Sequence, residues 1–116
     1  MTTHQKTILI VDDEPKNRNL LEALLKPEGY LTITASNGAN ALAITTEKLP
    51  DLILLDVMMP DMNGYDVTVK LKANPATLNI PIIMLSALDD RGSKLAGLNA
   101  GAEDFLTKPI DRVELW

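Results

Sequence analysis

The chain has 116 residues, a net charge of −5, one histidine and no cysteine. This length suits one domain with a real hydrophobic core, and it is too short for two. Without cysteine, the chain has no disulfides, thiolate metal sites or cysteine nucleophiles. The single histidine, His4, cannot supply a histidine metal site or a serine–histidine relay.

Charge and hydropathy exclude further classes of protein. Aromatic residues make up only 3% of the chain, and its lysines and arginines form no run. Direct nucleic-acid binding by this segment and binding to anionic membranes are therefore not expected. Residues 1–6 are polar and lack a signal-peptide core, and no window approaches the roughly 18 apolar residues of a membrane span. We expect no membrane segment and a cytoplasmic location.

The chain alternates five times between a short apolar run and a helical pattern. Such runs, bounded by turn residues, predict buried strands of a parallel sheet at 7–11, 31–35, 52–56, 81–86 and 104–107. Helices are predicted over 15–26, from Asn37 or Gly38 to the turn at Pro50, over 65–73, over 89–100, and from about Ile110. Repeated strand–helix units imply right-handed crossovers and an α/β doubly wound sheet with helices on both faces.

Residues at the helix ends sharpen this prediction. Asp13 is a candidate N-cap for the first helix, and Pro15 suits its first turn. Gly101 is placed to end the helix over 89–100, and two glycines inside that helix, Gly92 and Gly97, cost it about 1 kcal/mol each relative to alanine. We therefore expect the helix over 89–100 to be a mobile element. The inward face of the first helix is predicted to consist of Leu20, Leu21, Leu24 and Leu25.

The last predicted helix looks unfinished. Ile110, Val113 and Trp116 have the spacing of an inward helix face, and Trp116 is the final residue. We expect residues 1–116 to form a single domain cut from a longer protein, with its fifth helix truncated.

Polar side chains occur where the apolar runs stop. Asp12 and Asp13 follow the first run, Asp56 ends the third, Ser86 ends the fourth, and Lys108 follows the fifth. Ligands of parallel α/β sheets bind outside the carboxyl ends of the strands, so these side chains should converge on one edge. Carboxylate oxygens suit Mg²⁺, and a bound cation removes the repulsion among three carboxylates.

This grouping also suits phosphoryl chemistry. Asp56 could attack a phosphoryl phosphorus and form an acyl phosphate, while Lys108 and the Ser86 hydroxyl contact the phosphoryl oxygens. The backbone carbonyl of Met58 could reach the metal from the loop after Asp56. Taken singly, each residue also has an ordinary structural role: the acidic pair as a helix cap, Asp56 and Ser86 as strand ends, and Lys108 in a surface turn.

Four segments together resemble the receiver domain of bacterial two-component response regulators. They are ILIVDDE at 8–14, DLILLDVMMPDMNG at 51–64, IIMLSA at 82–87 and GAEDFLTKP at 101–109. The resemblance covers nearly the whole chain. It implies a flavodoxin-like five-stranded parallel sheet with strand order 2-1-3-4-5.

The resemblance also implies roles for individual residues. Asp56 would accept a phosphoryl group from a sensor histidine kinase or phosphotransfer protein. Asp12 and Asp13, with Asp56, would hold Mg²⁺. Ser86 would be the switch hydroxyl and Lys108 the partner of the phosphoryl group. Phe105 matches the switch aromatic of the family, although tyrosine is commoner there and its hydroxyl is absent here.

Partners follow from the same resemblance. The helix over 89–100, the strand over 104–107 and the last helix would form a surface that contacts an output domain, an effector protein or a second copy in a homodimer. The domain would be a signalling phosphoacceptor rather than an enzyme, since it would only assist its own phosphorylation and dephosphorylation.

Other readings of the site are weaker. A phosphatase or phosphotransferase of the haloacid-dehalogenase type needs a second aspartate two residues after its nucleophile, and that position holds Met58. The P-loop pattern G-x-x-x-x-G-K-[ST] and the dinucleotide pattern G-x-G-x-x-G are both missing. A degenerate receiver that docks partners without phosphorylation remains an alternative, which the complete set of site residues disfavours.

Overall fold

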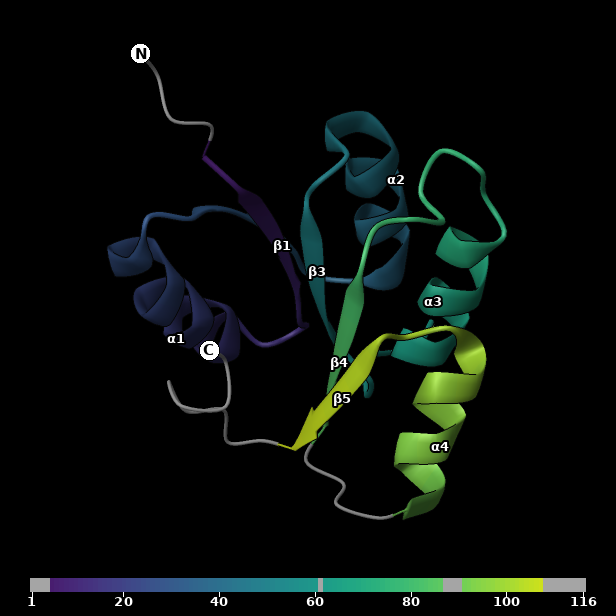
Figure 1. Cartoon of the computed structure of the whole chain (residues 1–116). Coiled ribbons are helices and arrows are strands. Elements are labelled where there is room, and N and C mark those ends of the chain that lie inside the picture. Colours follow the sequence, from purple (N-terminus) through teal and green to yellow (C-terminus); the bar gives the residue numbers. More distant parts are fainter. Residues whose placement is uncertain (1–4, 61, 87–90, 108–116) are drawn as a thin grey trace.

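Five strands alternate with helices in the computed structural model of the chain, which describes residues 5–60, 62–86 and 91–107 (Figure 1). The side chains of residues 91–94 and 107 are outside this description. In chain order the elements are β1 (Thr7–Val11), α1 (Pro15–Leu25), the short 3₁₀ helix η1 (Lys26–Glu28), β2 (Leu31–Ala35), α2 (Gly38–Lys48), β3 (Leu52–Asp56), α3 (Gly64–Lys72), β4 (Ile82–Ser86), α4 (Arg91–Ala100) and β5 (Asp104–Thr107).

The strands form one parallel sheet in the order β2-β1-β3-β4-β5. This confirms the α/β, flavodoxin-like architecture and its predicted strand order. Four strands have the predicted bounds, and β4 begins one residue later than expected, at Ile82. The register pairs Val11 with Leu55, Asp56 with Leu85, and Ser86 with Thr107, so the carboxyl ends of the central strands lie at one edge.

Alternate residues of each strand face two separate cores. The helices α2, α3 and α4 cover one face of the sheet, while α1 lies on the other (Figure 1). Phe105 belongs to the first core, whose buried strand residues include Leu9, Val11, Ile53, Leu55, Ile82 and Met84. The buried residues of the second core are Ile8, Ile10, Leu21, Leu25, Leu54 and Leu85.

The start of α1 differs from the prediction. Glu14, and not Asp13, is the N-cap residue, and its side chain makes no capping hydrogen bond. The Glu14 backbone N–H is instead bound by the Asp12 carboxylate, with a nitrogen–oxygen distance of 3.0 Å. Leu20 was also wrongly placed on the inward face: its side chain is 47% exposed, and the buried leucines of this helix are Leu21 and Leu25.

Asparagine side chains begin the next two helices. At the start of α2, the Asn37 side chain accepts a hydrogen bond from the Asn40 backbone N–H. At the start of α3, the Asn63 side chain accepts one from the Asp66 backbone N–H. These bonds satisfy donors that a helix start leaves unpaired.

The described part of α4 begins at Arg91, so its predicted start at Asp89 lies outside the described residues. Gly101 follows the helix with a φ of 116°, which confirms it as the residue that ends α4. The predicted last helix is also outside the described ranges. Among the helices of these ranges, none has the length and apolarity that a membrane span requires.

Candidate functional site

Three carboxylates meet at the carboxyl edge of the sheet. Oxygen atoms of Asp12, Asp13 and Asp56 all lie within 4.8 Å of one another. Asp12 and Asp56 are buried, at 1% and 4% exposure, whereas Asp13 is open to solvent. The predicted convergence of these residues is confirmed. A compact set of carboxylate oxygens with one open side suits a hard divalent cation such as Mg²⁺, which keeps part of its water shell.

Backbone contacts fix the acidic pair after β1. The Asp12 N–H donates to the Ala35 carbonyl of β2 over 3.1 Å. The Arg18 guanidinium donates to the Asp12 backbone carbonyl over 2.7 Å. The Asp12 carboxylate also accepts from the N–H of Glu14, the N-cap residue of α1. Asp12 is therefore held through both its backbone and its side chain, while its carboxyl group belongs to the cluster.

Asp56 ends β3, and the loop after it is held at both ends. Val57 donates its backbone N–H to the Leu85 carbonyl of β4, and its own carbonyl accepts from the Gly64 N–H over 2.9 Å. Val57 is buried, whereas 62% of the Met58 side chain is exposed. This loop therefore carries Met58 outward beside Asp56. The predicted use of its backbone carbonyl stays a prediction.

Ser86 and Phe105 lie on the neighbouring strands. Ser86 ends β4 and is fully buried, one residue beyond the register partner of Asp56. Phe105 is the register partner of Met84 and is 6% exposed, so its ring lies inside the core beneath α4. Lys108 lies outside the described residues, and its predicted place beside Asp56 stays a prediction.

Gly64 directly precedes the predicted helix over 65–73, and the structure gives this glycine a specific place. It is the first residue of α3, and a Cβ atom added to it would lie 2.5 Å from the Asp56 backbone oxygen. Any larger residue would therefore push the Asp56 peptide or α3 out of place. In the sequence, Gly64 is the last residue of the segment 51–64, and its position at the end of the loop after Asp56 is the feature that could have drawn attention to it.

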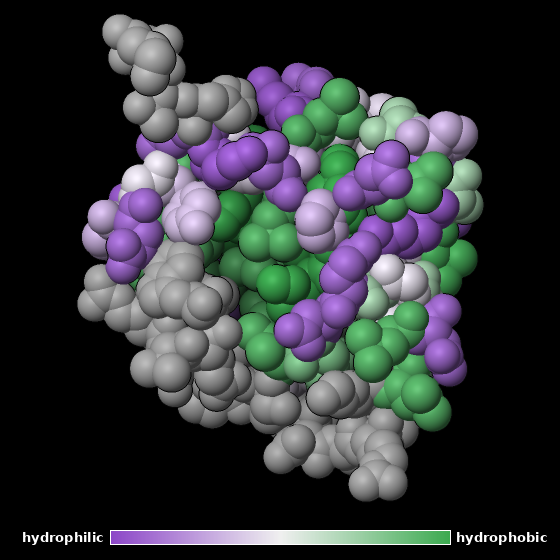
Figure 2. Space-filling view, viewed as in Figure 1, coloured by the Kyte–Doolittle hydropathy of each residue, from purple (hydrophilic) through white to green (hydrophobic). Residues whose placement is uncertain are grey.

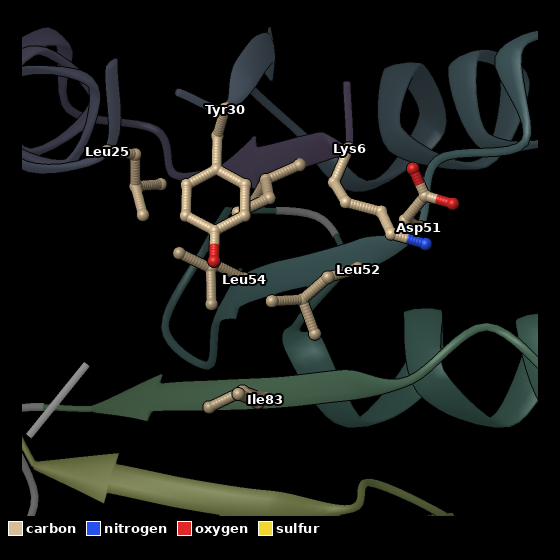
Figure 3. A pocket seen from close by; sticks show the side chains of 8 residues that line it. Lys6, Leu25, Tyr30, Asp51, Leu52, Leu54 and Ile83 are labelled. Atoms are coloured by element: carbon tan, nitrogen blue, oxygen red, sulfur yellow. The ribbon is translucent and has the colours of Figure 1, made fainter. Parts of the chain in front are cut away.

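A separate cavity of about 300 Å³ lies on the other face of the sheet. In the space-filling view, hydrophobic residues gather near the centre of the face, with polar residues above and to the right of them (Figure 2). Lys6 and Asp51 lie at one end of the cavity and Leu25 at the other, with Tyr30 and Leu54 between them (Figure 3). Its lining includes none of the three clustered carboxylates, so it is distinct from the acidic site.

A parallel sheet of strand order 2-1-3-4-5, with a cluster of three carboxylates at its carboxyl edge, matches the receiver domain that the sequence resembles. Residues 8–116 match the family model described as the response regulator receiver domain. The chain belongs to this family, whose members act in two-component signalling.

Individual relatives agree with this assignment. The response regulator PleD of Caulobacter vibrioides is 54% identical over 109 residues, which cover 94% of this chain and 24% of PleD. The chain spans less than half the length of the curated relatives that it matches. Its structure is similar to that of the Vibrio cholerae chemotaxis protein CheY4, with a TM-score of 0.91, 30% identity and coverage of 97% and 93% of the two chains.

Another similar structure bears on the acidic pocket. The receiver domain of the sensor histidine kinase PA1611 from Pseudomonas aeruginosa PAO1 has a TM-score of 0.88 and 34% identity, over 97% of this chain and 92% of the other. That structure has a magnesium ion coordinated in its active site cleft.

Proposed function

We propose that this domain accepts a phosphoryl group on Asp56, in a reaction that requires Mg²⁺, and thereby controls an output domain or effector protein. The observation that carries the proposal is the cluster of three carboxylates, with their oxygens within 4.8 Å, on the edge where β3 ends. Membership of the receiver family supports it.

In the proposed reaction, an Asp56 carboxylate oxygen attacks the phosphorus of a phosphohistidine on a kinase or phosphotransfer protein. A phosphorus–oxygen bond forms as the phosphorus–nitrogen bond breaks. The histidine nitrogen keeps the electron pair and takes a proton from solvent, and Asp56 becomes an acyl phosphate. The near-complete burial of Asp56 limits the approach of water and strengthens every charge interaction around it.

Asp12, Asp13 and Asp56, with the Met58 backbone carbonyl, would hold the cation. When bound, Mg²⁺ would neutralise charge on the phosphoryl oxygens. The Ser86 hydroxyl would donate to one of these oxygens and Lys108 would pair with another. Because the hydrogen bonds to Asp12 fix its backbone, this part of the site needs little rearrangement on binding.

The response would appear on the surface of α4, β5 and the chain that follows. Leu95 and Leu98 of α4 are 56% and 39% exposed, so this surface already presents apolar side chains to a partner. A phosphoryl group adds about −1.5 to −2 charge beside Ser86. Movement of Ser86 toward it would change the packing around Phe105 and bias the surface toward an output domain or a second copy. Such a protein is a signalling regulator that assists only its own phosphorylation and dephosphorylation.

The test is incubation with acetyl phosphate and Mg²⁺, followed by intact mass measurement. The wild-type chain should gain the mass of one phosphoryl group. The gain should be lost with a chelator and in Asp56→Asn, which keeps the shape of the side chain. A wild-type chain that gains no mass would instead support the degenerate receiver, and phosphate mapped to another residue would refute the assignment to Asp56.

A further inference from the structure

Met84 lies in the middle of β4, on the sheet face that carries α2, α3 and α4. Its side chain is fully buried. A Cβ atom added at Gly64 would lie 2.9 Å from Met84 Cε, and one added at Gly97 would lie 3.0 Å from Met84 Sδ. A single thioether side chain therefore packs directly against the first residue of α3 and against the inner face of α4.

At its methyl end, the Met84 side chain contacts Gly64, which itself lies against the backbone of Asp56. Gly64 lies so close to the peptide of Asp56 that an added Cβ would be 2.5 Å from the Asp56 oxygen. The Gly64 N–H also donates to the Val57 carbonyl. A displacement of the backbone at Asp56 and Val57 would therefore reach Met84 through Gly64.

At its sulfur, the side chain reaches the packing of α4. An added Cβ at Gly97 would lie 2.9 Å from Phe105 Cδ2 as well as 3.0 Å from Met84 Sδ. Met84 and Phe105 are also register partners on adjacent strands, so they share one face of the sheet. Figure 1 shows α3 and α4 side by side over this part of the sheet, and the two helices are in contact.

We propose that Met84 is a positioning residue that couples the backbone at Asp56 to the packing of α4 against Phe105, an inference that rests on the proposed phosphorylation of Asp56. Close-packed interiors transmit displacement because they compress little. Methionine is unbranched and flexible, so it fills a narrow slot between two glycines and changes between discrete rotamers. Glycine on both sides leaves no Cβ to separate the thioether from either helix.

A residue that merely fills the core would tolerate a change of shape at constant volume. Met84→Leu conserves volume and is expected to fold, but its branched, shorter side chain cannot reach both glycines. Ile82→Leu is the matched control, because Ile82 is fully buried on the same strand and the same face. Met84 is not placed among the groups that touch the phosphoryl group, so phosphorylation itself should persist in both variants.

The experiment measures two quantities on the 116-residue chain and its two variants. One is the phosphoryl mass gained with acetyl phosphate and Mg²⁺. The other is amide hydrogen exchange in 95–100 and 104–107, with and without beryllofluoride and Mg²⁺. We expect all three proteins to gain phosphate. The change in exchange caused by beryllofluoride should fall about threefold or more in Met84→Leu and persist in Ile82→Leu.

The possible outcomes distinguish failure of the proposed phosphorylation of Asp56 from failure of the proposed coupling through Met84. A wild-type chain that takes no phosphate refutes the proposed function, and this coupling with it. Wild-type phosphorylation with no exchange response, an undiminished response in Met84→Leu, or an equal loss in Ile82→Leu each overturns only the coupling.

A double-mutant cycle tests the contact without phosphate. Gly97→Ala should lower the unfolding temperature less in a Met84→Ala background than in the wild type, because the shortened side chain makes room for the new methyl group. Additive shifts overturn the proposed contact.

Discussion

Replacement of Lys72 by methionine should destabilise the domain far more than an ordinary surface substitution. Lys72 ends α3, and its ammonium group donates to the backbone carbonyls of Leu78 and Ile80 and to the Glu103 carboxylate, at 3.1, 3.0 and 2.7 Å. Glu103 in turn accepts from the Ile82 N–H at the start of β4. One lysine thus joins α3, the chain before β4, and the turn between α4 and β5.

The size of the expected loss in stability follows from how exposed each hydrogen-bond partner of Lys72 is. The Lys72 side chain is 17% exposed and that of Glu103 is 47% exposed, so solvent screening reduces their ion pair to about 0–1 kcal/mol. The larger loss comes from the carbonyls, because an acceptor left without its charged donor costs about 1–3 kcal/mol where it is buried. The bond to Ile80 is part-buried and the bond to Leu78 is exposed. We therefore expect the free energy of unfolding to fall by about 2 kcal/mol, or about 8 °C in melting temperature.

Urea unfolding followed by circular dichroism measures this loss. Methionine retains the apolar stem of Lys72, which packs beside Gly101, so the experiment isolates the ammonium group. Lys70→Met, at an exposed position of the same helix, is the control and should change stability by less than about 0.5 kcal/mol. Equal effects of the two substitutions would refute this reasoning. A loss in Glu103→Gln as large as that in Lys72→Met would show that the ion pair dominates.

Three further predictions concern the acidic edge of the sheet. Gly64→Ala should lower the free energy of unfolding by about 1–3 kcal/mol in urea, because the new methyl group meets the Asp56 backbone oxygen; unchanged stability would contradict that close approach. Asp13→Asn should weaken Mg²⁺ binding about tenfold in a calorimetric titration, since it removes one charge from the cluster, and equal affinity would show that this carboxylate is no ligand. Met58→Asn should speed loss of phosphate from Asp56 after the donor is removed, because a polar side chain beside Asp56 can orient water; an unchanged decay rate would exclude shielding by Met58.

Patterns within single segments predicted most of the fold. The strand bounds were predicted to within one residue, because an apolar run indicates a buried strand and the Asp or Ser that stops the run marks where the strand ends. The clustering of Asp12, Asp13 and Asp56 followed from a parallel sheet, whose strand ends share one edge. Lys108 lies beyond the described residues, so that part of the predicted site stays a prediction.

Features that depend on contacts between distant segments could not be predicted in this way. Asp13 has the residue type of an N-cap, yet Asp12 binds the Glu14 N–H because its backbone is held by Ala35 and Arg18. Gly97 was interpreted only as a weak point in a helix, whereas the structure shows it where a Cβ would strike Phe105 and Met84. No local pattern in the sequence reports such neighbours.

The strand order has a consequence for how the chain assembles during synthesis. β1 pairs with β2 on one side and β3 on the other, β4 pairs with β3, and β5 with β4. Taken from the N-terminus, each new strand adds to an edge that is still open, and none inserts between two strands already paired. A ribosome releases the chain in that same direction. Asp12 and Asp56 can therefore meet as soon as β3 docks on β1, before Ser86 and Phe105 have reached the sheet.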